Sequence, residues 1–383
     1  MQILHKGFDT ITLAIKANIP HDLFDFLVAE KELAEAERAP RPISYGGADF
    51  DLQPHGGSGY AFLLTGGPMD VRWAFKKPNS KDPWGTRVTV GSTLLATQGL
   101  GFVRAHLDKT LTRLGIRYLA EHISLSRVDF CVDVLAPDFD LTPENFVLHS
   151  HSNRADHITP DAEMRSNGKS GRFTSVTAGK MPGRQVIIYD KRREVIDRRK
   201  LIWWDIWNAS RDALGEAPLD PKDRDASQVW RIELRAGKNL LKDRWNIRTW
   251  ADFDKKFGDL IAETFEKVRY AEPDPSDTNR ARWPNHAIWD LVSAVAEDDL
   301  QEMRSYLDVD KVKSVHKADH IKLIMTLMIG NATTLAAMEG TTEEDLTDYM
   351  IKLGKRLKDD IHTNPSRAAN KLSEAKARYR FVA

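Results

Sequence analysis

The sequence has little cysteine, no long apolar run and no net charge. Among its 383 residues the one cysteine is Cys131, which excludes an intramolecular disulfide and a cysteine-based zinc site. We find no run of about 18 uncharged apolar residues and no charged N-terminal segment followed by a long apolar one. We therefore expect no membrane span, no signal peptide and a cytoplasmic location.

The charges balance, with 56 basic and 56 acidic residues. The global charge thus says nothing about a polyanionic partner, and a case for one must come from local clusters. A hydrophobic content of 41% and a charged content of 29% are ordinary for a globular protein.

The pattern of apolar residues changes along the chain. Short alternating stretches punctuated by glycine, with helices between them, extend to about residue 238, and only helical patterns follow. We predict an α+β domain over residues 1–271, with a mainly antiparallel sheet and packed helices. A linker over 272–284 and an all-helical C-terminal domain over 285–383 follow. The apolar run Ile321–Met328 is expected to be core, and a long basic helix is expected from Lys191 past Trp207.

The first motif is Arg127-Val-Asp129-Phe-Cys-Val-Asp133. On a strand, Arg127, Asp129 and Asp133 share one face. Four residues span about 13 Å, so both carboxylates bind one ion only if a twist or bulge helps. Carboxylates suit Mg²⁺ or Mn²⁺. The alternative is a strand with one face in water, where charged residues are normal.

The second motif is Val186-Ile-Ile-Tyr189-Asp190-Lys191, where an apolar strand delivers a tyrosine into a cluster of charges. Residues 172–200 contain nine basic and three acidic residues, a pattern that suits phosphate neutralisation. A tyrosine can attack a phosphodiester once a nearby cation lowers its pKa and a metal withdraws charge from the phosphate. Alternatively, Tyr189 packs at a strand end with its hydroxyl in water.

The third motif is Val229-Trp-Arg231-Ile-Glu233-Leu-Arg235. Arg231, Glu233 and Arg235 share one strand face, which places a carboxylate between two guanidiniums that match phosphate geometry. A cross-strand ion pair is the other interpretation. If the three strands are neighbours in one sheet, their charged faces form a single site beside Tyr189.

The order of these motifs, together with the opening Gly7-Phe-Asp-Thr-Ile, resembles the replication initiation factor family over roughly residues 5–260. That family includes initiators of rolling-circle plasmids, relaxases of integrative elements and phage replication proteins. The resemblance implies a metal-dependent nicking domain that forms a 5′-phosphotyrosine link. Asp129, Asp133 and Glu233 match its acidic positions, and Tyr189 and Lys191 match its Tyr-Asp-Lys motif.

One feature departs from the family. Many members have a second tyrosine upstream, in a Tyr-x-Gly-Ser-like segment, where this chain has Thr177-Ala178-Gly179-Lys180. Tyr45, Tyr60 and Tyr118 are the remaining candidates. The sequence also lacks the His-x-x-Arg segment that a tyrosine recombinase needs near its C-terminus.

We therefore expect a rolling-circle replication initiator or relaxase, with Tyr189 as nucleophile, Lys191 as its catalytic neighbour, and Asp129, Asp133 and Glu233 as ligands of Mg²⁺ or Mn²⁺. The alternative is a DNA-binding regulator of the same fold that has lost the chemistry. Expected partners are origin DNA, a host helicase and a second copy of the chain. Expected DNA contacts are Arg127, Arg172, Lys180, Arg184, Arg192, Arg193, Arg231 and Arg235.

Overall fold

The structure is a computed structural model, and it describes residues 1–67, 71–148, 164–169, 171–297 and 309–379. Its contacts divide the chain into two compact units, Met1–Asp308 and Val309–Ala383. The division lies later than the expected linker at 272–284. The reason is that Ile288, Trp289 and Val292 are buried in the core of the first unit.

The first unit is built on an eleven-stranded sheet with the order β2-β3-β4-β5-β6-β1-β7-β12-β11-β10-β9. Every neighbouring pair is antiparallel, which confirms the predicted α+β class. The strands of this sheet are β1 (Gln2–Ile15), β2 (Arg41–Tyr45), β3 (Ala48–Leu52), β4 (Phe62–Thr65), β5 (Val71–Phe75), β6 (Thr86–Val90), β7 (Ile123–Leu135), β9 (Met164–Lys169), β10 (Arg172–Gly179), β11 (Arg184–Asp190) and β12 (Val229–Gly237). A second sheet pairs β8 (Phe146–Leu148) with β13 (Val268–Tyr270).

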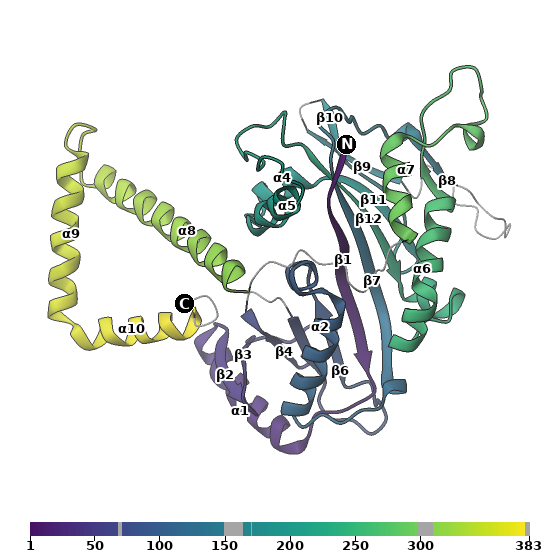
Figure 1. The fold of residues 1–383 in the computed structure, drawn as a ribbon. Coiled ribbons are helices and arrows are strands. Elements are labelled where there is room, and N and C mark those ends of the chain that lie inside the picture. Colours follow the sequence, from purple (N-terminus) through teal and green to yellow (C-terminus); the bar gives the residue numbers. More distant parts are fainter. Residues whose placement is uncertain (68–70, 149–163, 170, 298–308, 380–383) are drawn as a thin grey trace. The chain divides into compact units, whose positions relative to one another are not determined.

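Helices cover this sheet on both sides, and Figure 1 shows α4 and α5 on the opposite side of β1 from α6 and α7. The α-helices of the first unit are α1 (His21–Glu37), α2 (Ser92–Arg113), α4 (Lys191–Asp197), α5 (Ile202–Asp212), α6 (Trp250–Lys267) and α7 (Ala287–Ser293). The second unit contains α8 (Val309–Met338), α9 (Leu346–Thr363) and α10 (Pro365–Arg378). Short helical turns occur at Ala120–His122, Pro143–Asn145, Asn239–Arg244, Arg280–Arg282 and Ala294–Glu297.

The apolar side of the central strands packs against α6. This helix begins at a capping box in which Thr249 and Asp252 each accept from the other's backbone N–H. Its buried residues Phe253, Phe257 and Leu260 recur at helical spacing. The ring of Phe257 stacks on Phe253 at 4.5 Å and lies 5.8 Å from Phe8 of β1.

Two helix predictions need correction. The long basic helix is interrupted, because α4 ends at Asp197 and α5 begins at Ile202, with Arg199 in the left-handed region at φ 52° between them. In α8, Ile321, Ile324, Met325, Leu327 and Met328 are exposed rather than core. The segment Lys313–Met338 is also long and apolar enough to cross a membrane, which the sequence analysis did not anticipate. A single such helix is weak evidence, because core helices of the same length have the same composition.

We predict that Phe257→Ala lowers the free energy of unfolding by about 3–5 kcal/mol, because it leaves a cavity between α6 and β1. Leu33→Ala on the exposed face of α1 serves as the control and should cost less than about 1 kcal/mol. Urea denaturation of the full chain measures both values. Equal losses for the two variants would contradict the described core.

Candidate functional site

The three motif strands are neighbours, as the sequence analysis predicted. β12 lies between β7 and β11, with Arg231 opposite both Asp133 and Tyr189, and Arg235 opposite Asp129. Directly opposed residues of an antiparallel pair project to the same face, so these side chains share one side of the sheet. That face is buried over β7, since Asp129 and Asp133 are both 0% exposed. The alternative of a strand face in water is therefore wrong for these two carboxylates.

Three carboxylates converge on this face, and we call Asp9, Asp129 and Glu233 the acidic cluster. One ligand oxygen from each lies within 4.8 Å of the others. Asp9 reaches the cluster because the register of β1 against β7 shifts between Phe8 and Thr10. Such a β-bulge redirects a side chain that the regular alternation would place elsewhere.

The position of Asp133 separates it from Asp129 and Glu233, the other two expected metal ligands. Its carboxylate accepts two hydrogen bonds from Arg231 and one from the Trp207 indole at 2.8 Å. Burial disfavours its charge, but the Arg231 guanidinium holds the pKa of Asp133 below its usual range. Asp133 is thus engaged in a buried ion pair, whereas Asp9 lies in the acidic cluster with Asp129 and Glu233.

Arg231, one of the expected DNA contacts, is also buried. It is 0% exposed, pairs with Asp133 and Asp9, and stacks on the Trp203 ring with its guanidinium carbon 4.2 Å from the ring centroid. It is expected to hold the site together rather than to contact DNA. Burial opposes its charge, but Asp133 raises the pKa of Arg231 well above its ordinary value.

Other arginines contact the acidic cluster from positions that keep some exposure to solvent. Arg127 donates to Asp129, and the Arg235 Nε lies 2.7 Å from Glu233 Oε1. Their side chains are 35% and 30% exposed. Burial raises the pKa of Asp129 to about 7, and the charge of Glu233 adds to this while Arg127 and Arg235 oppose it. The carboxylates of Asp129 and Glu233 therefore repel each other, and both lie beside the Arg235 guanidinium.

Tyr189 lies at the end of β11, where the chain turns into α4. The turn is fixed by Asp190, whose carboxylate accepts from the backbone N–H of Arg193 at 2.8 Å and so caps the helix. Among the described residues the Tyr189 hydroxyl makes no hydrogen bond. Burial, and then the charge of Glu233, raise the pKa of Tyr189 well above 10. The Arg231 guanidinium acts in the expected direction and lowers this pKa, but burial outweighs it.

Lys191 follows the cap and turns inward. It is 1% exposed, and its Nζ lies 2.7 Å from Glu194 and 4.7 Å from the Trp203 ring centroid. Burial, and then the charge of Arg231, lower the pKa of Lys191. The Nζ is also 5.7 Å from the Tyr189 ring, so the two predicted catalytic residues are neighbours.

A cavity of about 490 Å³, which we call the tyrosine pocket, connects these groups. Tyr189, Lys191, Asp9, Glu233 and Arg235 all line it. Ser175 and Thr177 of β10 line it as well. Among the residues described, neither Tyr45 nor Tyr60 nor Tyr118 lines this pocket, and the Tyr118 hydroxyl donates to Asp108.

The five remaining predicted DNA contacts fall into two groups. Arg172, Arg192 and Arg193 line a second cavity beside the tyrosine pocket. Lys180 and Arg184 lie at the opposite end of β10 and β11, where Arg184 donates to Thr264, so they are not part of this site. His5 was missed by sequence reasoning. It pairs with Asp133 across β1 and β7 and packs edge-on against Trp203 at 5.1 Å.

No family model matches the sequence, and no curated protein matches it. A solved structure is similar to this chain. It is the rolling circle replication initiator protein from Geobacillus stearothermophilus, at 15% identity and a TM-score of 0.39, covering 79% of this chain and 98% of that one. A TM-score this low carries no argument about function, which must be inferred from the site itself.

We predict that His5 makes stability depend on pH. Burial lowers the pKa of His5 to about 4, whereas an unfolded histidine titrates near 6.5. The unfolded state therefore binds more protons between these values, so this contribution is full above pH 6.5 and is lost as the pH falls toward 4. From pH 7 to pH 5 the loss is about 2 kcal/mol.

His5→Phe keeps an aromatic ring against Trp203 and cannot titrate. Urea denaturation of both proteins at pH 7 and pH 5, in the presence of a chelator, measures the difference. If the stability of His5→Phe falls by as much as that of the unchanged protein, His5 is not the cause.

Proposed function

We propose that this chain is a metal-assisted DNA-nicking enzyme, a rolling-circle replication initiator or relaxase, with Tyr189 as its nucleophile. The observation that carries the proposal is the tyrosine pocket, where a phenol without a hydrogen-bond partner among the described residues shares one cavity with Asp9, Glu233 and Arg235. The order of the three motifs, which resembles the replication initiation factor family, supports the same conclusion.

The acidic cluster fits a divalent cation. Three carboxylate oxygens from three strands lie within 4.8 Å of one another, and oxygen ligands are what Mg²⁺ and Mn²⁺ prefer. The Oε2 atom of Glu233 is buried and has no partner among the described residues, although a buried carboxylate oxygen ordinarily has one. Asp9, Asp129 and Glu233 would hold the ion, which when bound would withdraw charge from the phosphate.

The chain's own residues supply the remaining chemistry. The phenolic oxygen of Tyr189 forms a bond to phosphorus, and the bond from phosphorus to the 3′ oxygen breaks. The phenol loses a proton and the departing 3′ oxygen gains one, so no water is consumed and the 5′ phosphate stays on Tyr189. Arg235, which lines the pocket and is partly exposed, is placed to neutralise charge that develops on the phosphate.

A second candidate is a DNA-binding regulator of the same fold without nicking activity. It is favoured by the arginines that already contact the acidic cluster, Arg127 at Asp129 and Arg235 at Glu233. Such pairs can satisfy the carboxylates without a metal. The two candidates differ in whether a covalent adduct with DNA forms.

We predict that Tyr189→Phe abolishes adduct formation. The full chain is incubated with Mn²⁺ and a randomised library of single-stranded oligonucleotides, and complexes that survive denaturant are separated and sequenced. Tyr60→Phe, which alters a tyrosine outside the pocket, should form adducts at the normal rate. Adducts formed by Tyr189→Phe would exclude this nucleophile, and their absence from the unchanged protein would favour the regulator.

We predict that Mn²⁺ raises the melting temperature of the unchanged protein and that Glu233→Gln weakens the apparent affinity at least tenfold. The reason is that a ligand which binds only the folded state stabilises that state, and the stabilisation increases with the ratio of ligand concentration to Kd. Asp197→Asn is the matched control, because this carboxylate lines the same pocket and is 61% exposed. An equal shift for Glu233→Gln and the unchanged protein would place the metal elsewhere.

A further inference from the structure

The second cavity, which we call the arginine pocket, opens beside the tyrosine pocket and measures about 530 Å³. Thr174, Asp190, Arg193 and Asp197 line both cavities, so a ligand can extend from one into the other. This volume falls in the range of about 300–1,000 Å³ that is usual for sites of small ligands. A nucleotide next to the one that reaches Tyr189 would therefore have a place to bind.

The charges in the arginine pocket are mixed rather than basic. Four arginines and five aspartates line it, namely Arg172, Arg192, Arg193, Arg224, Asp138, Asp140, Asp190, Asp197 and Asp225. Several of these groups are already engaged, since Arg193 pairs with Asp197 and Arg192 donates to Ser227 and to the Pro221 carbonyl. A site built only for phosphate would not contain so many carboxylates.

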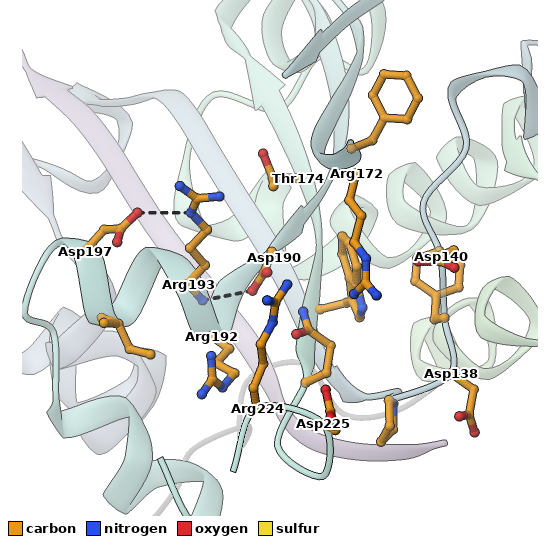
Figure 2. Close-up of a pocket in the computed structure, with 16 residues that line it drawn as sticks. Asp138, Asp140, Arg172, Thr174, Asp190, Arg192, Arg193, Asp197, Arg224 and Asp225 are labelled. Atoms are coloured by element: carbon orange, nitrogen blue, oxygen red, sulfur yellow. Dashed lines mark hydrogen bonds and ion pairs between the residues drawn. The ribbon is translucent and has the colours of Figure 1, made fainter. Parts of the chain in front are cut away.

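Within the described part of the chain, Arg172, Arg224, Asp138 and Asp225 make no side-chain hydrogen bond or ion pair with another residue. Figure 2 shows Arg172 and Arg224 extending from opposite sides toward the middle of the pocket, with Asp138 and Asp225 at its edge. The pocket thus offers unpaired guanidiniums and unpaired carboxylates to one ligand. That ligand must present both hydrogen-bond acceptors and hydrogen-bond donors.

Aromatic rings form part of the pocket wall. Phe173, next to Arg172, is 41% exposed, and Trp230 is buried with Phe139 edge-on at 5.2 Å. The indole N–H of Trp230 has no acceptor among the described residues. Exposed rings beside cations are typical of surfaces on which unpaired bases stack.

We propose that the arginine pocket binds one unstacked guanine of a single DNA strand, next to the nucleotide whose phosphate reaches Tyr189. Guanine has two acceptors, O6 and N7, on one edge, which a guanidinium binds in a bidentate manner. Its N1–H and N2–H donors lie side by side on another edge and match the two oxygens of a carboxylate. No other common base combines these two edges. This proposal rests on the proposed function and extends it, because it names the base that would bind beside the nicked phosphate.

Binding of the full chain to labelled dT12 and to dT12 with a single central dG tests the proposal. The assay uses the Tyr189→Phe variant without metal, so it reads binding and not cleavage. We expect the dG to lower Kd at least tenfold. Replacing dG by deoxyinosine, which lacks the N2 amine, should remove a large part of this gain. Equal Kd values for dT12 and the dG oligonucleotide, or a preference for another base, would overturn the proposal.

Variants locate the preference in the pocket. Arg172→Met, Arg224→Met and Asp138→Asn should each lower the dG preference, measured as the ratio of the two Kd values for the same variant, at least threefold. Lys222→Met removes an exposed charge nearby and serves as the control, with an unchanged preference. A preference that survives in all three pocket variants would place guanine recognition elsewhere and overturn the proposal.

The same oligonucleotides distinguish this proposal from the proposed function. Adducts formed by the unchanged protein without any guanine preference would overturn the pocket assignment alone. A guanine preference without adducts would support the pocket and contradict nicking.

Discussion

The site depends on a buried guanidinium that joins three strands. Arg231 on β12 pairs with Asp133 on β7 and Asp9 on β1, and Trp203 of α5 stacks on it. Burying such a network has a large desolvation cost, so it is weak evidence for stability. Its consequence here is positional, because it holds Asp9 at the bulge of β1 beside Asp129 and Glu233. Without Arg231, the buried carboxylate of Asp133 and the half-buried carboxylate of Asp9 would lose their paired guanidinium.

Much of this arrangement could be predicted from the sequence. Alternation in three separate stretches identified β7, β11 and β12 and the faces that carry their charges. The presence of Asp9 rather than Asp133 in the acidic cluster could not be predicted, because period-two alternation places Asp129 and Asp133 on one face and does not show which contacts each carboxylate makes. A β-bulge also interrupts the alternation of apolar and polar residues, so the sequence pattern does not reveal it. Asp9 was visible only in the opening Gly-Phe-Asp-Thr-Ile segment.

For the helices, too, the sequence pattern predicted position but not every break or the extent of burial. Apolar periodicity found α6, whose phenylalanines pack on β1. It could not show that the basic segment breaks at Arg199, since a single left-handed residue has no signal in propensity. In α8 the apolar run predicted a helix correctly, but burial depends on a partner surface, and Ile321–Met328 has no such surface within the described chain.

Two arginines that look equivalent in the sequence differ in how far solvent reaches them. Arg231 and Arg235 occupy the same face of one strand four residues apart, and both pair with carboxylates. Trp203 of α5 covers the Arg231 guanidinium, and the pair of Arg231 with Asp133 is closed to solvent, since both side chains are 0% exposed. Arg235 and Arg127 keep about a third of their side chains exposed and contact the acidic cluster from its edge. Three carboxylates this close repel one another when they are charged, and the edge arginines offset that repulsion. The buried end of the face therefore fixes the geometry, and the end at Arg127 and Arg235 is the part that solvent reaches.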